Sequence, residues 1–271
     1  PVAGLWPTER ADLWHLRRQV ERLRLASGFE RLACLDACRI DHHPHQHDAA
    51  LRALRDMRGR ALLADEVGLG KTIEAGLVMK ELLVRGLAHR VLILAPASLT
   101  GQWAEELEAK FGETFAIAKK PADWDGNQVI ASLDLARQPK HAAVALAQAW
   151  DLVIVDEAHK LKRRTTQVHQ LVARLNKRYL LLLTATPVQN DMGELFNLVN
   201  LLAEGQLGTP RDFEHRFMDA GDPRMPINAP ALRERLAEVM IRNRRSSVGI
   251  KLPPRRAGIY HLALPEDERV L

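Results

Sequence analysis

The sequence contains few cysteines and no long hydrophobic run. Cys34 and Cys38 are the only cysteines in 271 residues, too few for a disulfide framework and in keeping with a reducing cytoplasm. No apolar run approaches the ~18 residues of a membrane span, and the N-terminus lacks the charged-then-apolar pattern of a signal peptide. We therefore expect a cytoplasmic protein without a membrane partner.

The sequence also lacks internal repeats, low-complexity segments and a strong net charge. Lys and Arg number 39 against 34 Asp and Glu, which gives a net charge of +5. This mild excess favours polyanions such as nucleic acid, although a well-solvated surface explains the same numbers. Because the chain starts at Pro1 and stops at Leu271 within a charged run, we expect it to be part of a longer protein.

Short apolar runs alternate with helical stretches from Arg60 onward. The runs are continuously hydrophobic, as strands buried on both faces of a parallel sheet require. Repeated β-α units of this kind predict an α/β fold, doubly wound, with a mostly parallel sheet and helices on both faces. The five predicted strands contain residues 61–64, 91–94, 129–131, 152–155 and 180–183.

The strongest chemical signal is the glycine-containing segment 65–72, which follows the first predicted strand and opens a helix. Glycines let backbone N–H groups curl around phosphate oxygens, and the helix N-terminus adds its positive dipole end. Lys71 would reach the β- and γ-phosphates of ATP, and the Thr72 hydroxyl would ligate Mg²⁺. Asp65 stands where the generic phosphate-loop pattern has glycine, so the match to that pattern is imperfect.

Two further strand ends carry polar residues. Asp156 follows the strand at 152–155, where Mg²⁺ needs a second protein anchor, and Glu157 could polarise the attacking water. We therefore assign Lys71, Asp156 and Glu157 to catalysis, with Thr72 and Asp156 as the Mg²⁺ ligands. After the strand at 180–183, Thr184 and Thr186 can sense the γ-phosphate and are assigned to coupling.

Together these motifs match the superfamily-two helicase-like ATPases, and the residues of each motif resemble those of the Swi/Snf family, in particular its bacterial RapA-like branch. The acidic pair at 65–66 is typical of that family, and Gln46 is similar to its adenine-reading glutamine. The resemblance spans about residues 39–271 and implies a RecA-like fold with a helical C-terminal extension. The predicted nucleotide-binding residues are Gln46, Asp65, Glu66, Gly68, Leu69, Gly70, Lys71, Thr72 and Gln189.

The resemblance also implies a nucleic-acid contact. Segments similar to 95–103 and 132–134 lie along the nucleic-acid backbone in the family, and basic residues directly after His159 are a candidate for nucleic-acid binding or lobe closure. The basic stretch 242–256 could hold nucleic acid or be a solvated face that meets the second lobe. The predicted nucleic-acid-binding residues are Pro96, Ser98, Gln102, Ser132, Lys162 and Arg163.

The function implied is the first motor lobe of an ATP-dependent double-stranded DNA translocase, cytoplasmic and associated with the bacterial nucleoid. ATP and Mg²⁺ are its expected cofactors. Double-stranded DNA, a second RecA-like lobe of the same protein, and RNA polymerase or another nucleoprotein complex are its expected partners. The family's arginine finger belongs to the second lobe, so we expect this chain alone to be a nearly inactive ATPase.

Three alternatives remain. A strand-separating helicase or a restriction-type translocase is less similar at residues 65–66 and 252–254. A non-catalytic scaffold that keeps an ATPase fold is disfavoured by the intact Lys71, Thr72, Asp156 and Glu157. A GTPase is disfavoured because no Asn-Lys-x-Asp occurs.

The expected domain organisation is an N-terminal helical segment at 1–38, an ATP-binding lobe at 39–205 and a helical extension at 206–271. Within the first segment, residues 8–26 have near-helical apolar spacing. A further helix is predicted near 231–242, and a last strand candidate lies at 259–264. Two cysteines and four histidines gather at 34–47 and invite a zinc hypothesis, but their spacing matches no common structural zinc pattern. A partly exposed loop that leads into Gln46 is therefore the expectation there.

Overall fold

The computed structural model describes residues 28–187, 192–219, 221–222 and 225–246. Its centre is a parallel sheet with the strand order β3-β4-β2-β5-β6-β1-β7. All five predicted apolar runs form strands of this sheet, which confirms the α/β fold. The strands are β1 (Arg60–Leu63), β2 (Val91–Ala95), β3 (Ala116–Ile117), β4 (Gln128–Ser132), β5 (Ala149–Val155), β6 (Asn176–Leu183) and β7 (Met240–Ile241).

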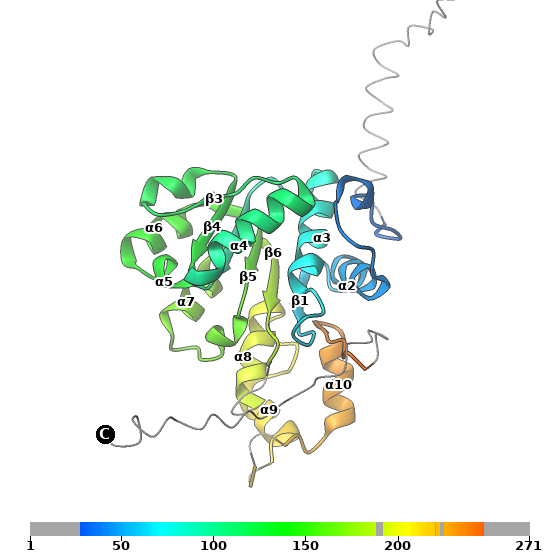
Figure 1. The fold of residues 1–271 in the computed structure, drawn as a ribbon. Helices are drawn as coiled ribbons and strands as arrows, with labels where there is room; N and C mark the ends of the chain where they lie inside the picture. The colour runs from blue at the N-terminus through cyan, green and yellow to red at the C-terminus, as the bar shows by residue number, and fades with distance from the viewer. Residues whose placement is uncertain (1–27, 188–191, 220, 223–224, 247–271) are drawn as a thin grey trace, which may run out of the picture.

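The continuous hydrophobicity of the strands is explained by helices on both faces. Successive side chains of a strand point to opposite faces, so Leu152 and Ile154 of β5 enter one core while Val153 and Val155 enter the other. Figure 1 shows α2 and α3 on one side of the sheet and α5, α6 and α7 on the other. The helices are α2 (Pro44–Arg55), α3 (Lys71–Val84), α4 (Thr100–Glu106), α5 (Leu133–Ala136), α6 (Pro139–Ala147), α7 (Gln167–Arg174) and α8 (Met192–Leu202).

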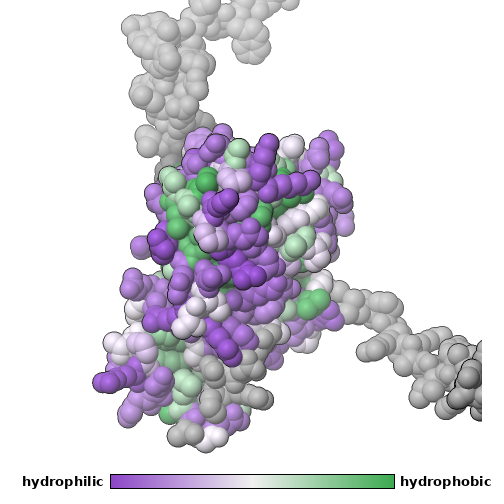
Figure 2. Space-filling model, turned by 90° about the vertical axis from the view of Figure 1, so that its left-hand side faces the viewer, coloured by the Kyte–Doolittle hydropathy of each residue, from purple (hydrophilic) through white to green (hydrophobic). Residues whose placement is uncertain are grey.

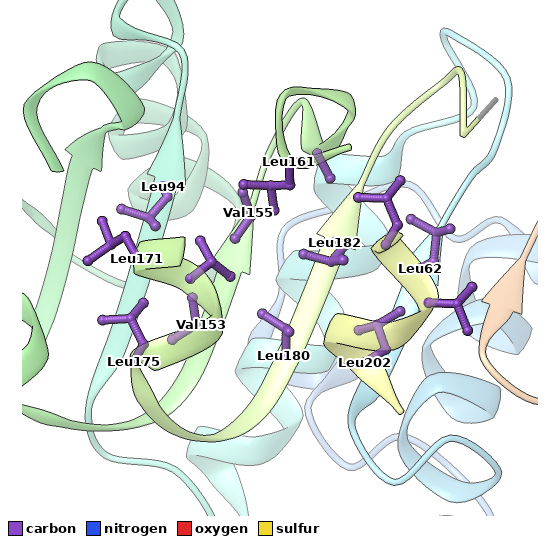
Figure 3. Close-up of a cluster of buried hydrophobic side chains, with 14 of the residues drawn as sticks. Leu62, Leu94, Val153, Val155, Leu161, Leu171, Leu175, Leu180, Leu182 and Leu202 are labelled. Atoms are coloured by element: carbon purple, nitrogen blue, oxygen red, sulfur yellow. The ribbon is translucent and has the colours of Figure 1, made fainter. Parts of the chain in front are cut away.

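The core under α7 and α8 contains many branched aliphatic side chains. Figure 3 shows Leu171 of α7, Leu175 directly after this helix and Leu202 of α8 directed at Val153 of β5 and Leu180 of β6. These five side chains are at most 5% exposed. Burying a side chain of this size contributes roughly 1.5–3 kcal/mol. The outer face on the α5–α7 side is predominantly hydrophilic, with small hydrophobic areas between polar side chains (Figure 2).

The chain after α8 forms two helices and then returns to the sheet. Helix α9 (Pro210–Phe217) begins with a reciprocal capping box between Thr209 and Asp212. Its Phe213 ring lies 5.1 Å from that of Phe196 in α8, centroid to centroid. Figure 1 places α8, α9 and α10 (Ala229–Ala237) together below the sheet in that view.

The helix predicted near 231–242 is wrong at its end. Helix α10 stops at Ala237, and Met240 and Ile241 form β7, whose residues pair with Leu62 and Leu63 of β1. The β1 edge offers unpaired backbone groups to this segment, and Ile241 is 1% exposed there. Tertiary pairing therefore overrides the local helical pattern.

The segment before α2 is fastened to the helix that follows the phosphate loop. The Ala33 and Cys34 backbone N–H groups donate to the two carboxylate oxygens of Glu81 in α3, at 3.0 and 2.8 Å. Arg85 adds a buried ion pair to the same carboxylate at 2.6 Å. Residues 33–34 thus pack on the lobe. The helix predicted at 8–26 and the strand candidate at 259–264 lie outside the described residues, and the domain boundaries stay predictions.

Candidate ATP and nucleic-acid site

Apart from Gln46, which lies on α2, the predicted site segments begin after the end of a parallel strand. Strands β1, β2, β4, β5 and β6 run in the same direction, so their carboxyl ends meet at one edge of the sheet. In open α/β sheets, this edge is where ligands bind. The phosphate loop follows β1, and Asp156 follows β5, with β6 between them. The fold therefore brings together motifs that lie almost a hundred residues apart in the sequence.

The backbone conformation of the phosphate loop requires both of its glycines. Gly68 and Gly70 have φ angles of 85° and 91°, in the region that residues with a Cβ avoid. A Cβ on Gly70 would also overlap the side-chain amide of Gln46. Gly70 is the N-cap of α3, so the helix begins directly at Lys71. The backbone N–H groups and dipole of the helix start thus face the loop interior, as phosphate binding requires.

Lys71 is held inside its own loop. Its Nζ donates to the Asp65 carbonyl oxygen at 2.8 Å, with the Glu66 carbonyl oxygen 3.5 Å away. These are neutral acceptors, weaker partners for an ammonium group than phosphate oxygens. Thr72 lies half-buried in the first turn of α3. The phosphate contact predicted for Lys71 and the Mg²⁺ contact predicted for Thr72 stay predictions.

Gln46 joins the phosphate loop from the start of α2. Its Nε2 donates to the Leu69 carbonyl oxygen at 3.0 Å, while its Oε1 is buried without a hydrogen-bond partner. A ring nitrogen of His45 lies 3.2 Å from the same carbonyl. A cavity of about 430 Å³ beside Gln46 is lined also by Arg39, Ile40 and Ile73. A buried amide oxygen in a partly apolar cavity fits the exocyclic amino group of a purine.

The acidic pair of the loop contacts the segment that follows β7, which the sequence did not predict. The Asp65 carboxylate accepts from the backbone N–H and the side chain of Asn243, at 2.7 and 2.9 Å. The Glu66 carboxylate accepts from the Arg245 backbone at 3.1 Å, and the Arg245 guanidinium donates to the Val67 carbonyl at 3.0 Å. The side chains of the acidic pair therefore fasten the chain after β7, while their backbone forms the phosphate loop.

Glu74 is a second residue that the sequence analysis missed. Its side chain is fully buried one turn into α3, and burial together with the neighbouring Asp65 carboxylate raises the Glu74 pKa to about 9. The charge of Lys71 acts in the opposite direction. Glu74 is therefore protonated at neutral pH, next to a carboxylate that is occupied by Asn243. In the sequence, only its position two residues after Thr72 could have indicated that Glu74 belongs to the site.

Asp156 and Glu157 form the second half of the site. Asp156 continues the alternation of β5 toward the face covered by α3 and α4, where Trp103 Nε1 donates to its Oδ2 at 2.9 Å. The Glu157 backbone N–H donates to Asp156 Oδ1 at 2.8 Å. Glu157 has a φ of 50°, which is unusual for a residue with a side chain and typical of strained functional positions. Its carboxylate lies 2.9 Å from His159 Nδ1.

The hydroxyl residues after β6 lie between these halves. Thr184 is 1% exposed, its backbone N–H donates to the Leu63 carbonyl at the end of β1, and its Oγ1 accepts from the Thr186 backbone N–H at 3.1 Å. This chain of contacts links the strand that carries the phosphate loop to the turn after β6. Gln189 lies outside the described residues.

Some of the predicted nucleic-acid-binding side chains are exposed, whereas others form hydrogen bonds or ion pairs within the lobe. Ser98 and Gln102 are exposed near the carboxyl end of β2, after Pro96, which caps a short 3₁₀ turn, and Gln102 Nε2 donates to Glu106 Oε1 at 2.8 Å. In the second group, the Ser132 hydroxyl caps α5 by accepting from the Leu135 backbone N–H.

The basic pair after His159 divides in the same way. Lys162 forms an ion pair with Glu194 of α8 at 2.9 Å and is largely buried. Arg163 is exposed. Ser98, Gln102 and Arg163 are therefore the predicted side chains best placed for a backbone contact, whereas Lys162 is engaged in packing α8.

The cysteine- and histidine-rich stretch shows no metal-ligand arrangement. Within the described part of the chain, no three His, Cys, Asp or Glu side chains converge as a metal site would require. His42 Nδ1 lies 3.3 Å from His47 Nε2, and the Cys38 thiol donates to the Cys34 carbonyl. None of the described helices is long and apolar enough to cross a membrane.

Comparison with known proteins identifies the family. Residues 45–271 match the model of the SNF2-related domain. The chain is 40% identical to "Uncharacterized ATP-dependent helicase YqhH" of Bacillus subtilis (strain 168) over 268 residues, which cover 98% of this chain and 48% of that protein. It is 38% identical to "RNA polymerase-associated protein RapA" of Actinobacillus pleuropneumoniae serotype 5b (strain L20), over 72% of this chain and 22% of that protein. The chain thus spans about half the length of the first relative and a fifth of the second.

Solved structures agree on the fold. The Sulfolobus solfataricus SWI2/SNF2 ATPase core in complex with dsDNA superposes with a TM-score of 0.67 at 21% identity, over 77% of this chain and 46% of that chain. The core domain from the same organism, not described as a complex, gives 0.65 at 23% identity, over 80% and 46%. The chain belongs to the SNF2-related family of helicase-like ATPases, in its RapA-like part, and folds as a first RecA-like lobe.

Proposed function

We propose that this chain is the first motor lobe of an ATP-dependent translocase that moves along double-stranded DNA. The observation that carries the proposal is the convergence of a phosphate loop, a strand-end carboxylate pair and an unpartnered buried amide oxygen at one sheet edge. These groups match the phosphates, the metal and the base of Mg-ATP. Support for DNA comes from the exposed residues near β2 at the same edge, and from the dsDNA complex of the Sulfolobus solfataricus relative.

Each residue has one task in the proposed ATPase. Lys71 leaves the Asp65 carbonyl and holds the β- and γ-phosphates, and the loop N–H groups surround their oxygens. Thr72 and Asp156 hold Mg²⁺, which when bound neutralises phosphate charge. Glu157 accepts a proton from the attacking water. Thr184 and Thr186 pass the state of the γ-phosphate to the neighbouring strands.

The contact with DNA is proposed to be one with the phosphate backbone and independent of sequence. Ser98, Gln102 and Arg163 have exposed polar side chains that can donate to phosphate oxygens. Each neutralised phosphate releases counterions, so affinity should fall steeply with salt. We expect a log–log slope of several units if roughly five or more phosphates are contacted. A flat salt response would contradict a backbone contact.

A second RecA-like lobe of the same protein is proposed to complete both sites. Positioned positive charge accelerates phosphoryl transfer, and an arginine finger commonly contributes about 10³–10⁵ in rate. We propose that this charge comes from the second lobe, so that the present chain alone folds but is nearly inactive. RNA polymerase or another nucleoprotein complex is the proposed target, because the RapA relative is named as polymerase-associated. The proposed location is the cytoplasm, at nucleoid DNA.

The deciding experiment measures ATP hydrolysis by the full-length protein. Reactions without nucleic acid, with single-stranded DNA, with duplex DNA and with RNA should show the largest stimulation by duplex DNA. Lys71→Ala and Asp156→Ala should each abolish turnover, and this chain alone should release phosphate about 10³–10⁵ times more slowly than the two-lobed protein. Comparable rates would mean that the chain carries a complete active site.

Two other outcomes correspond to the competing functions. A strand-separating helicase would release a labelled strand from a duplex at the expense of ATP, whereas a translocase displaces a third strand from a triplex without separating the duplex. A non-catalytic scaffold would bind its partner equally well after Lys71→Ala and show no turnover in the wild type. The intact Lys71, Thr72, Asp156 and Glu157 favour the motor.

A further inference from the structure

Trp103 has an unusual hydrogen-bond partner for a buried tryptophan. A buried indole N–H needs an acceptor, and a backbone carbonyl or a neutral side chain is sufficient. Two other tryptophans in the described residues show this: Trp150 donates to the Ala145 carbonyl at 3.1 Å, and Trp124 donates to His141 Nδ1 at 3.0 Å. Trp103, 2% exposed, donates instead to the Asp156 carboxylate.

The position of this donor follows from the fold. Asp156 is the residue after β5 that continues its α3/α4 face, and α4 crosses that face with Trp103 in the same core as Leu152 and Ile154. The Asp156 backbone N–H remains in the sheet, where it donates to the Leu94 carbonyl at 2.8 Å. The backbone of Asp156 is thus held by the neighbouring strand, and the orientation of its carboxylate depends on side-chain partners.

The two partners of the carboxylate leave room for a cation. Trp103 Nε1 donates to Oδ2 and the Glu157 backbone donates to Oδ1, one donor for each oxygen. A carboxylate oxygen has two lone-pair sites, so each oxygen keeps one acceptor site. Hydrogen bonds to a charged acceptor are roughly twice as strong as neutral ones, and the indole is immobile in the core. The carboxylate is therefore oriented before any metal arrives.

We propose that Trp103 is the positioning residue of the metal-anchoring carboxylate, and that its indole N–H sets the affinity of the site for a divalent cation. This inference rests on the proposed function for the role of Asp156, and extends it to a residue of the α4 segment. Partners that orient a ligating group typically contribute 10–100-fold to metal affinity. Removal of the indole N–H alone should therefore weaken metal binding by about 10-fold.

The test compares Trp103→Phe with Trp124→Phe in the full-length protein. Each variant loses one buried indole N–H and keeps an aromatic ring, but Trp124 lies in the core on the opposite face of the sheet. The first readout is the affinity for Mn²⁺ in the presence of a non-hydrolysable ATP analogue, measured by electron paramagnetic resonance of free Mn²⁺. We expect an affinity about 10-fold lower in Trp103→Phe, and a wild-type value in Trp124→Phe. Asp156→Asn provides the limit of a lost ligand.

The second readout is the Mg²⁺ concentration that gives half-maximal ATP hydrolysis, which should rise in Trp103→Phe while the maximal rate at saturating Mg²⁺ largely recovers. A purely structural role would lower stability and activity without moving the Mg²⁺ dependence. If Trp103→Phe does not fold, benzothienylalanine at this position keeps the ring shape and replaces only the N–H by sulfur.

The proposal and the proposed function can fail separately. Equal Mn²⁺ affinities in the Trp103→Phe and Trp124→Phe proteins, or no Mn²⁺ binding in the wild type, would overturn the role of Trp103. Absence of DNA-stimulated ATP hydrolysis in the wild-type protein, combined with weaker Mn²⁺ binding in Trp103→Phe but not in Trp124→Phe, would overturn the proposed function and leave the role of Trp103 supported.

Discussion

The phosphate loop and the Asp156–Glu157 turn are the two halves of one site, but they are held in different ways. The interior of the loop is shaped by Gly68 and Gly70 and by the bond from Lys71 to the Asp65 carbonyl, all within one short segment. The turn depends on Trp103, 53 residues earlier in the chain, for the orientation of its first carboxylate. Local backbone conformation builds the first half, and packing between distant elements builds the second.

The outer rim of the loop lies between these extremes. Asp65 and Glu66 belong to the local motif, yet their carboxylates bind Asn243 and Arg245, which are 178 and 179 residues away. The same motif therefore shapes the phosphate-binding interior and fastens the chain that leaves β7. The contacts with Asn243 and Arg245 give the acidic pair a structural role in a loop whose proposed ligand is itself an anion.

The largest expected effect separates hydrolysis from binding. Glu157→Gln should slow ATP hydrolysis by about 10²–10⁴-fold, the usual contribution of a general base, and should leave nucleotide affinity near the wild-type value. The reason is that, in the proposed mechanism, the loop holds the phosphates while Glu157 acts on the attacking water. Single-turnover hydrolysis and binding of a fluorescent nucleotide measure the two quantities.

Glu105→Gln is the control for this change, because Glu105 is an exposed carboxylate on α4. An unchanged rate in Glu157→Gln would remove the assignment of the base. A loss of nucleotide affinity as large as the loss of rate would mean that Glu157 contributes to nucleotide binding as well as to hydrolysis.

A smaller effect is expected from the backbone of the loop. Gly70→Ala places a Cβ at a φ of 91° and against Gln46, so we expect nucleotide affinity to fall by about 10-fold and stability by about 1–3 kcal/mol. Gly101→Ala in α4 is the matched control, since nothing lies within 4 Å of its added Cβ. Alanine there should stabilise by about 0.5–1 kcal/mol. Similar affinities in both variants would show that the loop is not shaped by its glycines.

The smallest effect concerns Glu74, the protonated acid beside Asp65. The folded-state pKa of Glu74, about 9, lies above its ordinary value of 4.5, so the folded chain binds an extra proton between those pH values. Stability contributed by that proton is present below pH 4.5 and is lost as the pH rises toward 9. Glu74→Gln should unfold like the wild type near pH 4.5 and be increasingly more stable above it.

The difference in the free energy of unfolding between Glu74→Gln and the wild type should grow by at most about 1.4 kcal/mol for each pH unit. Urea denaturation of both proteins at several pH values measures it, with Glu105→Gln again as the exposed control. A stability difference that does not change with pH would show that Glu74 is ionised in the folded chain.

Much of the lobe could be predicted because its strands are buried on both faces. Strands of a parallel sheet that is covered by helices on both faces have continuously hydrophobic sequences, and all five runs of this kind form strands. The two-residue strands at 116–117 and 240–241 are too short to show any pattern, and they exist because neighbouring strand edges offer hydrogen bonds. For the same reason the end of the helix predicted near 231–242 was wrong.

The candidate site divides in the same way. The sequence by itself determined which residues can carry the chemistry, because glycine conformation, a helix start and strand-end carboxylates are local properties of contiguous residues. Only the tertiary structure decided that Trp103 orients Asp156, that Asn243 occupies Asp65, and that Glu74 is buried beside it. Hydrogen-bond geometry and desolvation depend on which distant segments the packed sheet brings together, and no local pattern in the sequence encodes those neighbours.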